Sequence, residues 1–104
     1  MTAPELPLEV TWDTGKARSN LSKHGVSFTQ AASVMLDPNA LTVYDEAHSD
    51  FEERWFTLGM ASEGRLLAVA HTYSTTGPTS AVARIISARE ATRAERRQYL
   101  DNPI

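Results

Sequence analysis

The chain has 104 residues, 41% hydrophobic and 22% charged, which suits one compact domain with a single small core. Its formal charge of −3 argues against a general nucleic-acid binder, and the absence of cysteine excludes disulfides, thiolate metal sites and cysteine nucleophiles. No apolar run approaches the roughly 20 residues that span a bilayer, and the N-terminus has no export signal, so we expect a cytoplasmic protein without membrane contact.

The N-terminal part predicts a strand followed by a helix. Residues 1–8 are expected to form a loose lead into a short strand at 8–12. Asp13 stands where a helix N-cap would, and Gly25 where a left-handed C-cap would. Together they predict a short helix over 14–24.

A second helix has the clearest local pattern in the chain. Ser27 and Gln30 form a capping box, and Asp37-Pro38 ends the helix because the residue before a proline avoids helical geometry. The apolar residues between these signals recur at helical spacing: Phe28, Ala31, Ala32, Met35 and Leu36.

After Pro38 the hydrophobic period changes to two, which indicates strands. We expect strands at 41–44, 54–60, 65–73 and 81–88, separated by an acidic loop at 45–50, a hairpin turn at 62–64 and a polar loop at 74–80. A second capping box, Thr92 with Glu95, predicts a last helix to about residue 100. The order predicts one α+β domain over 1–104, an antiparallel β-sheet with the two N-terminal helices packed on it and a C-terminal helix. The other sheet face would be open to a partner or substrate.

Charge is unevenly distributed along the chain. Residues 37–63 hold seven acidic residues and one basic residue, whereas residues 64–99 hold six basic and two acidic residues. Guanidinium groups suit phosphate because their planar fork donates two parallel hydrogen bonds. The alternative is a solvated surface that pairs with the acidic segment. Five arginines lie between positions 84 and 97 and are the candidates for phosphate binding: Arg84, Arg89, Arg93, Arg96 and Arg97.

The three histidines show no zinc-binding spacing. His24 fits a cap at a helix C-terminus. His71 lies on a strand predicted to neighbour the strand of Arg84, where a histidine could perform acid–base chemistry on a phosphodiester, or could be half buried and bonded to backbone. His48 stands in the acidic loop, whose carboxylates are compatible with a hard cation. The signal is weak because the loop lacks an ordered ligand spacing such as that of an EF-hand.

Several blocks in fixed order resemble the BrnT family of toxins over residues 9–100. The first block is the run 12–28, WDTGKARSNLSKHGVSF, and the second is Asp37-Pro38. The acidic loop with His48 follows, and then Glu53 with Arg54. The last block is RIISAR at 84–89, continued by Ala91-Thr92-Arg93 and Glu95-Arg96-Arg97.

The resemblance implies an endoribonuclease toxin of a type II toxin–antitoxin system with a RelE-like fold. It would cut RNA without a metal or other cofactor and so inhibit translation. Its partner would be a BrnA-like ribbon-helix-helix antitoxin that neutralises it in a heterotetramer. The resemblance does not assign the acid and base. As a working hypothesis, the 2′-hydroxyl of the RNA attacks the adjacent phosphorus, with His71 or His24 as acid or base, Tyr99 as a weak acid and the arginines stabilising the developing charge.

The candidate residues divide into two groups. The catalytic candidates are His24, Glu53, Arg54, His71, Arg84 and Arg89, and the RNA-binding candidates are Lys23, Arg93, Arg96, Arg97 and Tyr99. Two other classes of function stay open: a non-catalytic nucleic-acid-binding module that uses the C-terminal arginines, and an interaction protein that only holds a partner.

Overall fold

The structure is a computed structural model that describes residues 8–49 and 52–101. The expected loose lead therefore lies outside the described residues, apart from Leu8, which begins the first strand. The elements follow in the order β1 (Leu8–Trp12), α1 (Thr14–His24), α2 (Phe28–Val34), β2 (Leu41–Tyr44), η1 (Glu46–His48), β3 (Arg54–Met60), β4 (Leu66–Thr72), β5 (Ser74–Gly77), β6 (Ser80–Glu90) and α3 (Arg93–Asp101).

The sheet is mixed, so the prediction of an antiparallel sheet is wrong in one part. Its strand order is β1-β6-β4-β3-β2, with β5 paired to β6. The pairs from β2 to β6 are antiparallel, but β1 runs parallel to β6, from Leu8 opposite Ala81 to Trp12 opposite Ile85. Adjacent hairpin strands can be paired from sequence, whereas nothing in the period of β1 specifies a partner about seventy residues away.

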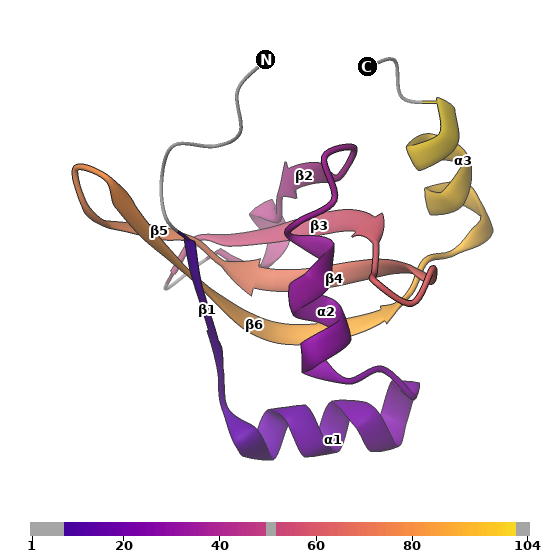
Figure 1. The fold of residues 1–104 in the computed structure, drawn as a ribbon, viewed down its shortest axis with the longest axis horizontal. Coiled ribbons are helices and arrows are strands. Elements are labelled where there is room, and N and C mark those ends of the chain that lie inside the picture. The colour runs from indigo at the N-terminus through magenta and orange to yellow at the C-terminus, as the bar shows by residue number, and fades with distance from the viewer. Residues whose placement is uncertain (1–7, 50–51, 102–104) are drawn as a thin grey trace.

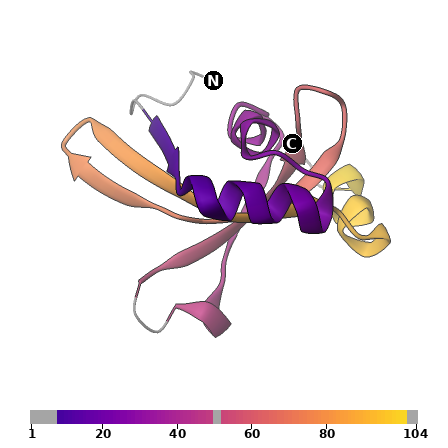
Figure 2. The same ribbon diagram turned by 90° about the horizontal axis from the view of Figure 1, so that it is seen from below.

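Helices α1 and α2 lie together on one face of the sheet (Figures 1 and 2). Helix α1 contacts β6, and α2 contacts β6, β4 and β3. Both helices begin at the predicted caps: an Asp13 carboxylate oxygen accepts from the Lys16 N–H at 2.9 Å, and Ser27 Oγ accepts from the Gln30 N–H at 3.1 Å. Gly25 ends α1 with a φ of 67°, as its position predicts.

Two details of these helices differ from the apolar pattern. Helix α2 ends at Val34 rather than near Leu36. The N–H groups of the next three residues, 35–37, donate to carbonyls three residues back instead of four, which tightens the last turn. Leu36 is 83% exposed. In α1, Leu21 is 53% exposed and the buried side chain is the polar Asn20.

The main core lies between these helices and the sheet. Trp12 and Phe28 meet edge to face, with ring centroids 6.1 Å apart. The buried residues of this core are Val26, Phe28, Ala31, Val34, Ala61, Leu67, Val69, Ile85 and Ala88.

The strand region contains one confirmed turn and two corrections. The turn at 62–64 is present, with Gly64 at a φ of 87°. The polar segment expected to be a loop at 74–80 instead forms β5, which pairs with β6 although it has no apolar alternation. The acidic loop contains the short helix η1.

Helix α3 covers part of the other sheet face, so that face is only partly open. The predicted capping box is present: the Thr92 N–H donates to Glu95 Oε1 at 2.9 Å, and the Glu95 N–H donates to Thr92 Oγ1 at 3.1 Å. Ala91 and Tyr99 pack against a small apolar cluster of Leu58, Leu66 and Ala68. None of the described helices is long and apolar enough to cross a membrane.

Candidate functional site

Arg54, Arg84 and Arg89 lie on the sheet face opposite α1 and α2. Residues next to Arg84 and Arg89 in β6, Ile85 and Ala88, are buried under those helices. Successive side chains of a strand alternate between faces, so these arginines point the other way. In β3, Trp55 lines a cavity on the helix-covered side, so its neighbour Arg54 points to the same face as Arg84 and Arg89. We call this face, which bears the three arginines, the arginine face.

A carboxylate connects two of these arginines. Arg84 Nη2 donates to Glu52 Oε1 at 2.6 Å, and Arg54 Nη2 lies 3.9 Å from the same oxygen. Thr72 of β4 lies between them, opposite Arg54 in the register and accepting from the Arg84 N–H at 3.2 Å. Within the described part of the chain, the Nε of Arg54 has no hydrogen-bond partner, but it is buried and therefore not open to a ligand. Arg84 is exposed and uses only Nη2 on Glu52, so it keeps donors that a phosphate could use.

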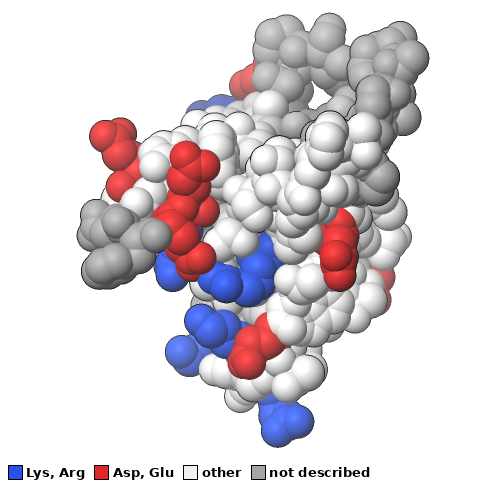
Figure 3. All heavy atoms as spheres, turned by 90° about the vertical axis from the view of Figure 1, so that its left-hand side faces the viewer, with Lys and Arg blue, Asp and Glu red and all other residues white. Residues whose placement is uncertain are grey.

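Each of these three arginines has an acidic neighbour: Glu52 lies beside Arg84 and Arg54, and Glu95 lies beside Arg89. Figure 3 shows acidic and basic side chains next to one another on the side of the molecule that faces left in Figure 1. Phosphate binding here would depend on a few placed guanidinium groups rather than on a broad positive surface.

Arg89 is held by α3. Its Nη1 and Nη2 donate to the two carboxylate oxygens of Glu95 at 2.8 and 3.0 Å. The hydrogen bonds from Arg89 lower the pKa of Glu95 to about 2, and the same carboxylate raises the pKa of Arg89. Since Glu95 also closes the capping box, one carboxylate both begins α3 and fixes it to β6.

The predicted RNA-binding residues do not form one surface. Arg93, Arg96 and Arg97 are exposed on α3 and form no salt bridge with any described residue. Lys23 and His24 are exposed in the last turn of α1, on the other side of the sheet. Only the α3 residues lie on the helix that flanks the arginine face.

Tyr99 has a structural partner. Its hydroxyl donates to Asp37 Oδ2 at 2.6 Å, and this hydrogen bond raises the pKa of Tyr99 to about 12. Asp37 also accepts from the backbone N–H groups of Met60 and Asn39, at 2.7 and 2.9 Å. The sequence indicated Asp37 as a helix stop and as part of a family motif, but not that its carboxylate joins the end of α2, β3 and α3.

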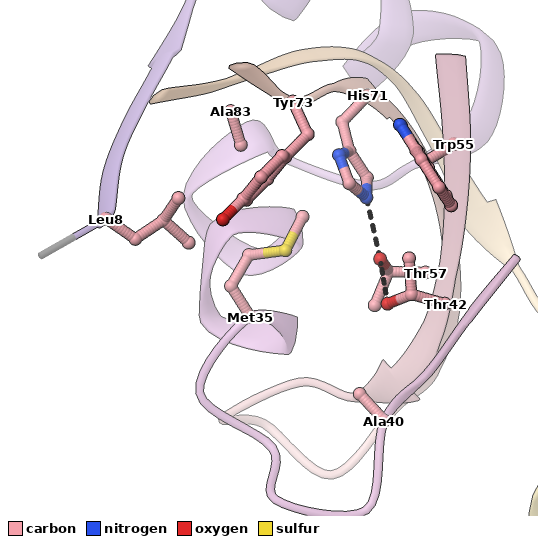
Figure 4. A pocket seen from close by; sticks show the side chains of 9 residues that line it. All are labelled: Leu8, Met35, Ala40, Thr42, Trp55, Thr57, His71, Tyr73 and Ala83. Atoms are coloured by element: carbon pink, nitrogen blue, oxygen red, sulfur yellow. Dashed lines mark hydrogen bonds between the residues drawn. The ribbon is translucent and has the colours of Figure 1, made fainter. Parts of the chain in front are cut away.

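His71 is buried on the helix-covered face, opposite the arginines. It is 3% exposed, and burial lowers its pKa. Its Nδ1 lies 2.9 Å from the Thr72 carbonyl and therefore donates, so Nε2 accepts from Thr57 Oγ1 at 2.6 Å. A further hydrogen bond joins Thr57 Oγ1 to Thr42 Oγ1 at 2.9 Å (Figure 4). The strand of His71 does neighbour that of Arg84, but the two side chains point to opposite faces.

A cavity beside His71 is mostly apolar. It has a volume of about 360 Å³ and is separated from the arginines by the sheet. Figure 4 shows side chains from β1, β2, β3, β4 and β6 around it, together with Met35, Ala40 and Tyr73 from the connecting segments. The residues that line it are Leu8, Met35, Ala40, Thr42, Trp55, Thr57, His71, Tyr73 and Ala83.

Other candidates have simpler surroundings. Glu53 is exposed beside Glu52, and His48 lies in η1, where its side chain is outside the described part. Among the described residues, no group of three or more His, Cys, Asp or Glu side chains is arranged to hold a metal ion. The catalytic and RNA-binding roles of the predicted residues stay predictions.

Sequence reasoning did not identify Glu52 or Asn20. Glu52 precedes Arg54 by two residues, the spacing that brings side chains to one side of an extended chain. Asn20 stands at a helical position without an apolar signal, and only the fold reveals its partners, the backbone groups of Val26 and Ala88.

Comparison with known proteins identifies the family. A comparison with curated protein sequences gives no significant match. A crystal structure of the Brucella abortus ribonuclease toxin BrnT has a similar fold, with a TM-score of 0.59 and 20% identity over 83% of this chain and 99% of that chain. The family model for the ribonuclease toxin BrnT of type II toxin–antitoxin systems matches residues 12–95. Because that match covers most of the chain, the protein belongs to the BrnT family of ribonuclease toxins of type II toxin–antitoxin systems.

Proposed function

We propose that this BrnT-family ribonuclease is a metal-independent endoribonuclease that cuts RNA on the arginine face and thereby inhibits translation. The observation that carries the proposal is the convergence of Arg54, Arg84 and Arg89 from two strands on one face, outside the helix-covered core. We also assign the fold to the RelE-like group, on the α+β layout with α1 and α2 on one sheet face.

The arginines supply charge stabilisation at the phosphodiester. Arg84 and Arg54 lie within 4 Å of a common carboxylate oxygen, so their guanidinium groups are close enough to act on one phosphate. In the transition state the nonbridging oxygens gain negative charge, and preorganised guanidinium donors stabilise that charge more than the ground state. Arg89, held by Glu95, extends the cationic face toward α3.

Helix α3 guides the RNA chain. Arg93, Arg96 and Arg97 are exposed on it, next to the strand end that bears Arg89. Exposed guanidinium groups bind successive phosphates without reading bases, and such binding weakens with added salt. Lys23 and His24 lie on the other side of the sheet and have no part in this path.

The protein antitoxin that the family implies is, in this proposal, a ribbon-helix-helix protein that neutralises the toxin in a heterotetramer in the cytoplasm. The acidic segment over 37–63 would suit a basic partner, since opposite surface charges speed association and select the correct partner.

Expression of the chain tests the proposal. Induced alone, it should arrest growth and shorten cellular RNA, and co-expression of the neighbouring gene product should relieve both effects. The purified chain should cut RNA in buffer containing EDTA. Absence of arrest, or arrest without RNA cleavage, would favour a module that only binds.

A further inference from the structure

We infer that Glu52 is the general base of the RNA-cleaving site. Neither the family match nor the sequence motif assigns this residue. The inference rests on the proposed function, because it requires that the arginine face binds the RNA phosphate. It names Glu52, rather than the neighbouring Glu53, as the carboxylate that acts there.

The geometry places Glu52 between the two arginines. Oε1 accepts from Arg84 Nη2 at 2.6 Å and lies 3.9 Å from Arg54 Nη2. Neither the hydrogen bonds nor the salt bridges of the described residues engage Oε2. The side chain is 41% exposed, so a substrate can reach it. One carboxylate oxygen is thus anchored and the other is available to accept a proton.

Arg84 retains the capacity to bind phosphate while it holds Glu52. It uses one of its five N–H donors on Glu52, and its side chain is 48% exposed, so further donors are open to a phosphate. A phosphate that takes these Arg84 donors would lie beside Oε2. The 2′-hydroxyl next to that phosphate would then be within reach of the carboxylate.

Neither His71 nor His24 can take this role without a rearrangement. His71 is buried under the helices, and both ring nitrogens are engaged, by Thr57 and by the Thr72 carbonyl. His24 ends α1 on the far side of the sheet. The Tyr99 hydroxyl is bonded to Asp37. Glu95 is the other carboxylate bonded to an arginine of this face, and both its oxygens are used by Arg89.

The proposed step is a transesterification. Glu52 takes the proton of the 2′-hydroxyl, the 2′-oxygen forms a bond to phosphorus, and the bond from phosphorus to the 5′-oxygen breaks. The 5′-oxygen takes a proton from solvent, and Glu52 later returns its proton to solvent. The products are an RNA fragment with a 2′,3′-cyclic phosphate and a fragment with a 5′-hydroxyl, with no change in oxidation state.

The test separates cleavage from binding with one substitution. A labelled mixed-sequence RNA oligonucleotide reports single-turnover cleavage, and its fully 2′-O-methylated counterpart, which lacks the nucleophile, reports binding. Glu52→Gln should slow cleavage about 100-fold or more, as expected for loss of a general base, while the analogue still binds within about threefold. Glu52→Asp should retain part of the rate because it keeps a carboxylate. Thermal unfolding confirms that each variant folds.

Glu63→Gln is the matched control, because Glu63 is exposed in the hairpin turn and the substitution removes the same charge. It should leave cleavage unchanged. If Glu52→Gln cuts as fast as the wild type or faster, or if Glu53→Gln alone abolishes cleavage, the assignment is wrong. If the wild type itself does not cut RNA, the proposed function fails before the role of Glu52 is reached.

Discussion

Replacing Asn20 with alanine should be among the most destabilising polar substitutions in this chain. The Asn20 amide donates to the carbonyls of Val26 and Ala88 at 2.9 and 2.8 Å and accepts from the Ala88 N–H at 3.0 Å. Three hydrogen bonds at about 1 kcal/mol each predict a loss of about 3 kcal/mol, since the backbone partners stay buried without replacement. For a domain of this size that loss corresponds to a fall in Tm of roughly 12–24 °C.

Urea denaturation followed by circular dichroism measures this loss directly. Ser19→Ala, at the exposed neighbouring position of α1, is the control and should change the free energy of unfolding by less than about 0.5 kcal/mol. Asn20→Asp should destabilise at least as much as alanine, because it buries a carboxylate and loses both donors. A loss below about 1 kcal/mol for Asn20→Ala would refute the view that this side chain joins α1 to β6.

Three further predictions concern groups with perturbed pKa values. Tyr99→Phe removes the hydrogen bond to Asp37 and should lower the free energy of unfolding by about 1–2 kcal/mol in urea titrations, with RNA cleavage retained. Burial lowers the pKa of His71, so protonation favours the unfolded chain: stability should decline as the pH falls below about 6.5, and Tm measured against pH should lose this slope in His71→Gln. The hydrogen bonds from Arg89 lower the pKa of Glu95 to about 2, so their stabilisation should be complete above about pH 4.5 and lost as the pH falls toward 2. Acid titration of Glu95→Gln should lack that loss, and an unchanged acid transition would contradict the prediction.

Local signals in the sequence predict the helices and most strands well. Asp13, Ser27 and Thr92 each cap a helix as their spacing indicates, because a cap depends only on residues within one turn. The parallel pairing of β1 could not be predicted in the same way. It depends on contacts between segments about seventy residues apart, for which a hydrophobic period contains no partner information.

The residues of the candidate site could be chosen from the sequence, but their geometry could not. The arginine block predicts a phosphate site, which stays a prediction, and strand alternation is consistent with Arg84 and Arg54 on one face. The sequence favours His71 as an acid or base because its strand lies beside that of Arg84. However, His71 pairs with Ile85, the residue next to Arg84, so the His71 and Arg84 side chains point to opposite faces of the sheet. Glu52 is joined to Arg84 by a contact across 32 positions, which no local pattern specifies.

Whether the arginine face cuts RNA can be decided by measuring the rate of RNA cleavage in EDTA for the wild type and for Arg84→Ala. Removing one preorganised donor to the developing charge should slow cleavage about 100-fold or more, while thermal unfolding shows an intact fold because Arg84 is exposed. If the arginine face cuts RNA, the wild type cleaves RNA in EDTA and the folded variant nearly loses this activity. Full activity of folded Arg84→Ala, or no cleavage by the wild type, would contradict a catalytic role for this face.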